Sequence, residues 1–469
     1  MTTDCNPQQL EFQGVGRRTV VASFDGGTLT SDGGALLLGE LERRRAIVRQ
    51  FAACFKDRRH PAWIEHSVEE LVRQRVFGLA LAYEDLNDHD VLRSDPLLAT
   101  IVGKADPTGS DRRHEQDRGK PLAGKSTLNR LELGAVVQGR YHKIALDEAA
   151  VDRFFVDVFL SAYERAPEQI VLDLDATDDP LHGQQEGRFF HGYYDSYCYL
   201  PLYIFCGSHL LCARLRRSNI DASAGAVEEV ERIVTQIRSQ WPEVVIILRA
   251  DSGFAREELM SWCEQHEVDF VFGLARNARL QGILATELTQ AQTRSEVSGK
   301  AERLYKDFLY CTRQSWSQPR RVIGKAEHLP HGANPRFLVT SLRAELWAAA
   351  PLYEKLYCAR GEMENRIKEQ QLCLFAGRTS THWIKSNQLR LWFSSVAYVV
   401  LSELRRLGLA GTELASARCD TIRLKLLKIG AQIQVTVRKV WVRLTSSYPH
   451  AALWGQIVRQ LRAGPLPQV

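Results

Sequence analysis

The spacing of hydrophobic positions changes twice along the chain. Residues 1–165 open with a short extended stretch, RRTVVASF, and then carry apolar side chains at the spacing of helices. Ser67 to Glu70 has the S-x-x-E form of a helix-capping box, directly before the apolar-periodic LVRQRVFGLALAY. A further helix is expected from about Asp147 to Arg165. The charged, aperiodic segment 104–125 is predicted to be a mobile loop within this mainly helical region.

Strand patterns replace the helical spacing after residue 165. IVLDLDAT, YCYLPLYIF and LLCARLRR lie close together, as in a meander, and a helical pattern follows at 222–240. VVIILRAD is an uninterrupted apolar run typical of a buried central strand, and a helix and the strand DFVFGLAR come after it. Three strands, a helix, a strand and then alternation is the order of a ribonuclease-H-like α/β core, whose first part we place at 166–276.

The last third of the chain changes pattern again. Short alternating stretches, RLYKDFLYCTR and RRVIGK, predict a β-rich insertion at 277–345. Two long helices are expected at about 351–375 and 385–407, within a second part of the core at 346–408. In the final segment, 409–469, TIRLKLLKIGAQIQVTVRKVWVRL fits helix or strand equally. The fold class predicted is therefore α/β, with a helical N-terminal domain, an interrupted core and a basic C-terminal segment.

Composition limits the class of protein. A chain of 469 residues is expected to form two to four domains, and 45% hydrophobic with 25% charged residues is usual for a globular protein. No apolar run approaches the ~20 residues that span a bilayer, and MTTDCNPQQLEF lacks the regions of a signal peptide. The ten cysteines contain no CxxC pair, which favours buried reduced thiols. We therefore expect a cytoplasmic protein.

Positive charge is unevenly distributed, although the net charge is only +5. From Leu401 to Val469 there are eleven Lys or Arg against three acids, a local net of +8. A second cluster near the N-terminus consists of Arg43, Arg44, Arg45, Arg49, Lys56, Arg58 and Arg59. A solvated helical face explains either cluster alone. Two such clusters flanking acidic residues favour a polyanionic partner, because a nucleic acid needs its phosphates neutralised.

Three acidic residues stand in contexts that suit metal-ion chemistry. Asp175 closes IVLDLDAT, Asp251 ends VVIILRAD, and Glu364 lies in the helical YCARGEMENRIKE. Each also has a structural explanation: a solvated strand face for Asp175, a turn or helix cap for Asp251, and an i,i+4 ion pair with Lys368 for Glu364. Two strand carboxylates and one helix carboxylate can, however, converge on a pair of divalent cations that cut and join phosphodiester bonds.

The helix expected around Glu364 carries two neighbouring stripes. Leu356, Ala359, Met363 and Ile367 form an apolar stripe that would anchor the helix on the core. One residue later, and about 100° round the helix, a polar stripe presents a phenol, cations and the carboxylate together: Tyr357, Arg360, Glu364, Lys368 and Gln371.

These residues together resemble a known family. Tyr357-x-x-Arg360-x-x-x-Glu364, with Asp175-Ala176-Thr177 and Asp251, resembles the DDE transposases of bacterial insertion sequences, in the branch with a Tyr-Arg-Glu-Lys signature. DLDATDDPLHGQQEG, LRADSGFA and RGEMENRIKEQQL resemble the group named after insertion sequence thirteen-eighty, over about residues 23–449. In one departure, the lysine expected seven residues after the glutamate is Gln371, so Lys368 would supply that DNA contact.

The resemblance implies a specific activity. Asp175, Asp251 and Glu364 would hold two Mg²⁺ ions, which Mn²⁺ can replace, and Tyr357, Arg360 and Lys368 would contact DNA. Cleavage at terminal inverted repeats and joining to target DNA would follow, with a DNA hairpin as the expected intermediate. The expected partners are double-stranded DNA and a second copy of the chain, and the bound protein would lie on the nucleoid. A catalytically silent DNA-binding derivative and a ribonuclease-H-like nuclease without strand transfer are the alternatives.

One segment matches the sequence of a nucleotide-binding motif but lacks the structural context that the motif needs. Residues 119–126, GKPLAGKS, fit G-x-x-x-x-G-K-S, yet a phosphate-binding loop needs a buried strand before it. The preceding GSDRRHEQDR cannot be such a strand, so no nucleotide cofactor is expected. Ser126 or Thr127 is predicted instead to cap the helix TLNRLEL.

Overall fold

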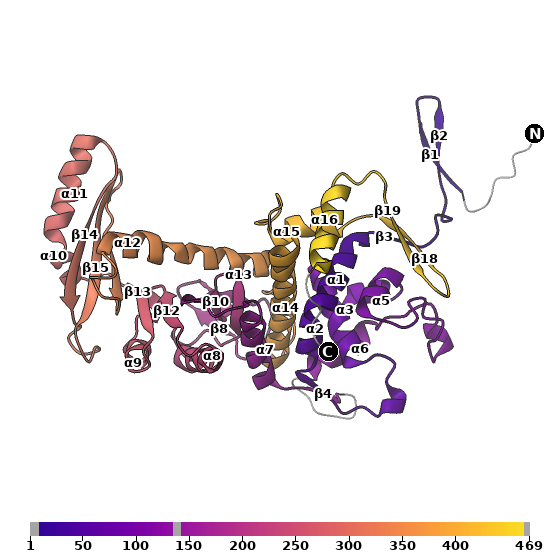
Figure 1. The fold of residues 1–469 in the computed structure, drawn as a ribbon, viewed down its shortest axis with the longest axis horizontal. Helices are drawn as coiled ribbons and strands as arrows, with labels where there is room; N and C mark the ends of the chain where they lie inside the picture. Colours follow the sequence, from indigo (N-terminus) through magenta and orange to yellow (C-terminus); the bar gives the residue numbers. More distant parts are fainter. Residues whose placement is uncertain (1–8, 135–141, 464–469) are drawn as a thin grey trace, which may run out of the picture.

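A computed structural model describes residues 9–134 and 142–463 and shows an elongated molecule (Figure 1). The N-terminal part is helical, as predicted: α1 Leu36–Arg45, α2 Ile47–Ala52, α3 Val68–Ala80, α4 His89–Leu92, α5 Pro96–Val102, α6 Lys125–Leu133 and α7 Glu148–Leu160. The capping box of α3 is confirmed, because the Ser67 hydroxyl accepts from Glu70 N and the Glu70 carboxylate accepts from Ser67 N. The two short strands β4 (Phe55–Asp57) and β5 (Ile144–Leu146) pair beside these helices.

The charged segment 104–125 runs without regular secondary structure apart from a short turn at Glu115–Asp117. It packs on the helical domain through Arg112, which is buried. The guanidinium of Arg112 donates to the Glu65 carboxylate and to the backbone oxygen of Lys120.

One large mixed sheet forms the centre of the molecule. Its strands are β6 Gln169–Ala176, β10 Leu202–Cys206, β11 His209–Arg214, β12 Val245–Ala250, β13 Asp269–Leu274, β14 Glu302–Tyr310, β15 Arg320–Leu329, β16 Gly332–Ala333 and β17 Arg336–Thr340. The order is β11-β10-β6-β12-β13-β17-β15-β14, with β16 beside β15. Among the described strands of this sheet, β12 pairs in parallel with both β6 and β13, and the other neighbours pair antiparallel. This α/β arrangement agrees with the predicted fold class.

The stretch YCYLPLYIF forms two strands in different sheets, where the pattern suggested one. Its first half is β9 (Ser196–Tyr199), which pairs with β7 (Asp179–Pro180) and β8 (Phe189–His191). Its second half is β10 in the central sheet. Pro201 separates them, because proline has no N–H for a sheet ladder.

Helices cover both faces of the central sheet. On one face, α8 (Ala226–Gln240), α9 (Glu257–Gln265) and part of α7 bury the side chains of Ile170, Leu172 and Leu174. The opposite face is crossed by one continuous helical rod, which runs through α12 (Ala349–Pro351), a π-helical turn (Leu352–Tyr357) and a 3₁₀ turn into α13 (Gly361–Leu374) (Figure 1). Because side chains alternate along β6, Asp173 and Asp175 point towards this rod. The two long helices expected here are confirmed, the second being α14 (Ile384–Gly408).

The segment after β13 contains more helix than its pattern indicated. Two helices that were not predicted, α10 (Ala278–Ile283) and α11 (Ala285–Ser298), precede the strands. The alternating stretches form β14 and β15, and β17 pairs with β13, so these strands extend the central sheet.

The C-terminal segment folds back onto the start of the chain. The stretch that fitted helix or strand is both: α15 (Cys419–Ile422) and a π-helical turn come first, followed by β18 (Ala431–Val435) and β19 (Val440–Leu444). β18 pairs with β3 (Leu29–Thr30), and α16 (Ala451–Arg462) packs into the core of the N-terminal helices. The exposed hairpin of β1 (Leu10–Val15) and β2 (Arg18–Ala22) projects beyond this region (Figure 1). Within the described ranges, no helix has the length and apolar character needed to cross a membrane.

Candidate active site

Asp175 and Asp251 lie side by side at the carboxyl edge of the parallel strands β6 and β12. Leu174 is opposite Ala250 in the register of these strands, and the next residue on each is the aspartate. Open α/β sheets bind their ligands at this edge, because the strand ends leave side chains uncovered there. The two residues that the sequence singled out at strand ends are thus brought together.

Glu364 reaches the same place from the helical rod. It lies in the first turn of α13 and lines a cleft of about 690 Å³ with both aspartates. The cleft is lined by acidic, cationic and aromatic groups, among them Asp175, Asp251, Arg360, Glu364, Lys368, His191, Tyr193 and Tyr194. Side chains from distant parts of the sequence therefore line one cleft.

Each aspartate also makes a local hydrogen bond. Asp251 Oδ1 accepts from Gly253 N at 2.8 Å and so caps the turn that leaves β12. Asp175 Oδ1 accepts from Ala176 N at 2.9 Å. The turn-capping explanation of Asp251 is therefore correct, and it coexists with a position in the cleft, since one oxygen is enough for the cap.

The negative charges of the cleft act on Asp175. Burial, followed by the charge of Asp251, raises the pKa of Asp175 to about 7, with a further rise from Glu364 and a lowering from Arg360. Arg360 donates to Glu364 in an ion pair of 2.9 Å. The guanidinium thus offsets part of the repulsion among three carboxylates.

Tyr357, the last residue of the π-helical turn, packs its hydroxyl against Gly273 of β13. A Cβ atom at Gly273 would be 2.6 Å from the Tyr357 hydroxyl and 2.9 Å from Ser252 N, so only glycine allows this approach. Burial raises the pKa of Tyr357, whereas Arg360 lowers it. Tyr357 is missing from the residues that line the cleft in the part of the chain that the structure describes, so of the three predicted DNA contacts the cleft gathers Arg360 and Lys368.

Arg249, which the sequence analysis did not single out, fixes the rod against the sheet. Its guanidinium donates to both oxygens of Asp173, at 2.5 and 2.8 Å, and also to the backbone oxygen of Leu356. Leu356 directly precedes Tyr357, and both residues belong to the π-helical turn. A charged residue inside the apolar run VVIILRAD was the available signal, because a buried cation needs a partner.

A comparison with family models gives a match over nearly the whole chain. The model described as transposase DDE domain group 1 matches residues 12–466. The chain belongs to this transposase family. A comparison with curated proteins found no significant match. Membership supports a transposase role, with DNA as the partner, and members of the family generally use divalent metal ions.

The transposase cleft offers the donors that such ions prefer. Mg²⁺ binds few carboxylates together with water and phosphate oxygens, and the three acids supply carboxylate oxygens only. Within residues 9–134 and 142–463, no three His, Cys, Asp or Glu side chains are gathered closely enough to hold one ion. The type of donor suits a divalent cation, but the side chains are not gathered around one point, and Glu364 is engaged by Arg360.

Gln371 and Lys368 occupy different environments in this transposase. Gln371 donates from Nε2 to the backbone oxygen of Asp178 at 3.1 Å, which ties α13 to the loop that follows Asp175. Lys368 is exposed and lines the cleft one helical turn after Glu364. Gln371, where the resemblance led us to expect a lysine, thus links α13 to this loop.

Aromatic groups at the cleft were missed from sequence. His191, Tyr193 and Tyr194 lie in the β8–β9 hairpin and line the opening, with Tyr193 85% exposed. The Tyr194 hydroxyl donates to the backbone oxygen of Ala176. The dense aromatic string FFHGYYDSYCY was the signal, since exposed aromatic side chains in a soluble hairpin indicate a contact surface.

The two basic clusters differ in the structure. In the N-terminal cluster, Arg44 donates to backbone oxygens of α16, Arg45 pairs with Glu403, and Arg59 pairs with Asp57. These cations hold elements together, which favours the structural explanation for this cluster. At the C-terminal end, Arg438, Lys439 and Arg443 are exposed on the β18–β19 hairpin beside the half-exposed Trp441.

The GKPLAGKS string forms no strand-to-helix loop. A short turn and irregular chain precede α6, and Lys125 pairs with Asp90 at 3.1 Å. The predicted cap at Ser126 or Thr127 was wrong, because α6 already begins at Lys125. Asp90, distant in sequence, accepts from Lys125 N in place of a local cap.

Proposed function

We propose that this transposase binds the terminal inverted repeats of an insertion sequence, cleaves DNA at the element ends and joins the 3′ ends to target DNA. The observation that carries the proposal is the convergence of Asp175, Asp251 and Glu364 on one cleft, from two neighbouring strand ends and a helix. Two strand acids and one helix acid in a family of transposases suit metal-assisted phosphodiester chemistry.

The three carboxylates would hold two Mg²⁺ ions, or Mn²⁺ in their place. Such ions supply Lewis acidity and a nucleophile at neutral pH. Arg360 would release Glu364 to the ions and turn towards a DNA phosphate, because a guanidinium matches phosphate geometry. Lys368 would contact the same backbone, and Tyr357 would hold Arg360 in place.

The surrounding fold supports the finer assignment. Strand order β11-β10-β6-β12-β13, with the last three parallel, suits a ribonuclease-H-like core interrupted before the glutamate helix. We assign the chain to the Tyr-Arg-Glu-Lys branch and to the group named after insertion sequence thirteen-eighty. Residues 1–165 and 409–469 would bind DNA, 277–345 would be the insertion, and two copies of the chain would hold two ends together on the nucleoid in the cytoplasm.

A cleavage assay on DNA that carries the gene's own flanking ends tests this function. Wild type, Asp251→Asn and the control Asp157→Asn are compared with Mg²⁺, with Mn²⁺ and with EDTA. Asp157 is an exposed acid on α7, so it matches the charge change outside the cleft. We expect metal-dependent cuts at the repeat boundary in wild type and control, and a loss of at least a hundredfold in Asp251→Asn.

Two other results would replace the proposal. Sequence-specific binding without cutting would identify a catalytically silent DNA-binding protein. Cutting that ignores the element ends would identify a nuclease without strand transfer. Full cleavage by Asp251→Asn would remove this residue from the site.

A further inference from the structure

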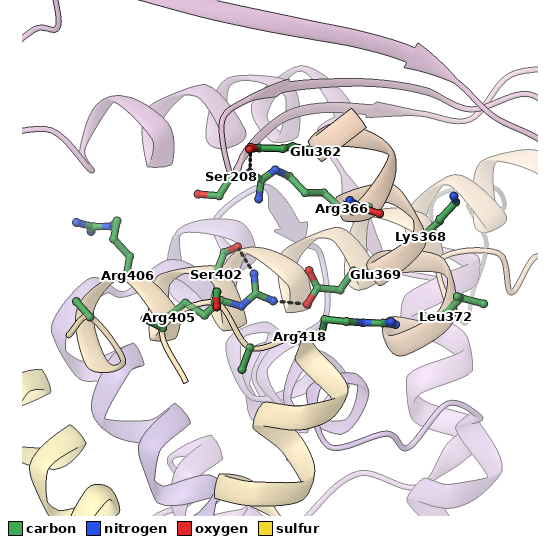
Figure 2. Close-up of a pocket in the computed structure, with 15 residues that line it drawn as sticks. Ser208, Glu362, Arg366, Lys368, Glu369, Leu372, Ser402, Arg405, Arg406 and Arg418 are labelled. Carbon is green, nitrogen blue, oxygen red and sulfur yellow. Dashed lines mark hydrogen bonds and ion pairs between the residues drawn. The ribbon is translucent and has the colours of Figure 1, made fainter. Parts of the chain in front are cut away.

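A second cleft, of about 920 Å³, lies on the other side of α13 from the three carboxylates. Figure 2 shows Arg366, Arg405, Arg406 and Arg418 around it, from α13, α14 and the segment directly before α15. We call it the cationic cleft. Its charged lining residues are Arg366, Lys368, Arg405, Arg406 and Arg418 against Glu362 and Glu369.

The acids nearby are too few to neutralise these cations. Arg405 pairs with the buried Glu369, and Arg406 must share Glu403 with Arg45. Arg418 is 57% exposed and lies 3.7 Å from Asp420, too long for a close ion pair. Among the residues that line the cleft, Glu362 pairs with Arg366 at 3.1 Å and Glu369 with Arg405, so five positive and two negative side chains leave an excess of positive charge over a concave surface, where the field of the charges is concentrated.

Lys368 connects this surface to the catalytic cleft, because it lines both. Glu364 and Gln371 line one cleft and Arg366 and Glu369 line the other, so the two clefts open on different faces of α13 and meet at Lys368. A helix with side chains is about 10–12 Å across. Since a DNA strand advances about 3.4 Å per nucleotide, this width corresponds to about three or four nucleotides.

We propose that the cationic cleft binds backbone phosphates of the DNA strand that leaves the catalytic cleft over Lys368, about three or four nucleotides from the phosphate that is cut. The proposal rests on the proposed function. Arg418 would make the main contact, since guanidinium groups bind phosphate oxygens in pairs and its side chain is the most exposed of the four arginines there. Arg366 would add a second contact by exchanging Glu362 for a phosphate. No base contact is needed, so this contact would position DNA without reading its sequence.

The test combines a protein variant with a chemical change in the DNA. Neutral methylphosphonates replace single phosphates, one position at a time, in a duplex that carries the gene's own end. Binding to wild type, Arg418→Gln and Arg418→Glu is measured by fluorescence anisotropy in EDTA. We expect Arg418→Gln to weaken binding about tenfold and to reduce the salt dependence by about one phosphate contact.

The decisive result is the coupling between the two changes. A methylphosphonate three or four nucleotides from the cut should weaken DNA binding by wild type and change the affinity of Arg418→Gln little. The proposal would be overturned if the methylphosphonate lowered the DNA affinity of wild type and Arg418→Gln equally. It would also be overturned if Arg418→Gln bound unmodified DNA as tightly as wild type. The control Arg153→Gln removes an exposed arginine from α7, and a loss as large as that of Arg418→Gln would also overturn it.

A free anion is the other source of the same chemistry. If millimolar inorganic phosphate stabilised wild type but not Arg418→Gln while the methylphosphonate scan showed no coupling, the cleft would be a small-anion site and the proposal would fail. Because binding is measured in EDTA, coupling without any metal-dependent cleavage in the earlier assay would leave this DNA path standing and remove the proposed catalysis. Arg366→Gln provides a second variant should Arg418→Gln unfold at a lower temperature than wild type.

Discussion

The carboxylates at and near the cleft differ in whether a cation compensates their burial. Asp173 is buried but has Arg249, whereas Asp175 has its pKa raised by burial and by Asp251. Asp179 is the extreme case: it is buried, and its Oδ1 has no hydrogen-bond partner among the described residues. Burial, with the charge of Asp178, raises the pKa of Asp179 to about 8. Charge is thus concentrated where few protein groups compensate it, a common property of functional sites.

Asp179 makes the free energy of unfolding depend on pH between the two pKa values of its carboxyl. Its carboxyl has a pKa of about 8 in the folded state, against an ordinary value of 3.8 in the unfolded chain. Between these pH values the folded state binds the extra proton, so the free energy of unfolding falls as pH rises through this window. Asp179→Asn should flatten the fall between pH 5 and pH 8 by on the order of 2 kcal/mol or more. Urea unfolding at several pH values measures it, and parallel curves for variant and wild type would contradict the assignment.

A divalent cation should relieve the repulsion in the cleft of Asp175, Asp251 and Glu364. Mg²⁺ or Mn²⁺ binds the folded state only, so it should raise the melting temperature of wild type at pH 8. Asp251→Asn and Glu364→Gln should respond to at least tenfold higher metal concentrations, because each loses a charged ligand. Thermal unfolding with Mg²⁺ and with Ca²⁺ measures the effect, and Asp157→Asn is the matched control. Equal shifts in all four proteins would place the ion elsewhere.

Elements with a strong pattern could be predicted from sequence, and those positioned by distant partners could not. β6, β12 and α13 were predicted, together with the three acids they carry, because each has a clear apolar run or stripe. α11 was missed because Ala291 is its only fully buried residue, so its sequence has no apolar stripe. The role of Arg249 was also hidden, since Asp173 and Leu356, its partners, are 76 and 107 residues away.

Arg249 should act as the link between sheet and helical rod. Arg249→Met leaves Asp173 buried without a partner and frees the Leu356 oxygen, so it should lower the free energy of unfolding by about 3–5 kcal/mol. Asp173→Asn combined with Arg249→Met should recover a large part of the loss, because the buried charge is then gone. A double-mutant cycle by urea unfolding checks this coupling. Additive effects of the two substitutions would exclude the link.

The whole molecule is held together by pairings that no local pattern shows. β17 joins β13, so the segment expected as an insertion continues the central sheet. β18 joins β3, so the basic C-terminal segment is anchored at the start of the chain. Patterning predicted a β-rich segment around β17 and left helix or strand open for β18, and in neither case does it contain information on the strand that becomes the partner. The β18–β19 hairpin therefore projects from a fixed base with exposed cations at its free end (Figure 1).

This hairpin should contribute to the affinity for DNA and leave folding unchanged. Val437 at its tip is fully exposed, and Lys439 and Arg443 lie over the ring of Trp441, a cationic and aromatic surface on a ribbon of two strands. A β-ribbon of this kind fits the major groove.

Arg438→Gln with Lys439→Gln should weaken binding of the element end about tenfold and reduce the salt dependence by about two phosphate contacts, because two cations are removed. Anisotropy titrations at several salt concentrations measure both, with melting temperature as the folding check. Arg153→Gln with Arg294→Gln, on the exposed faces of α7 and α11, is the charge-matched control, and an equal loss in that control would show that the hairpin contributes only its net charge.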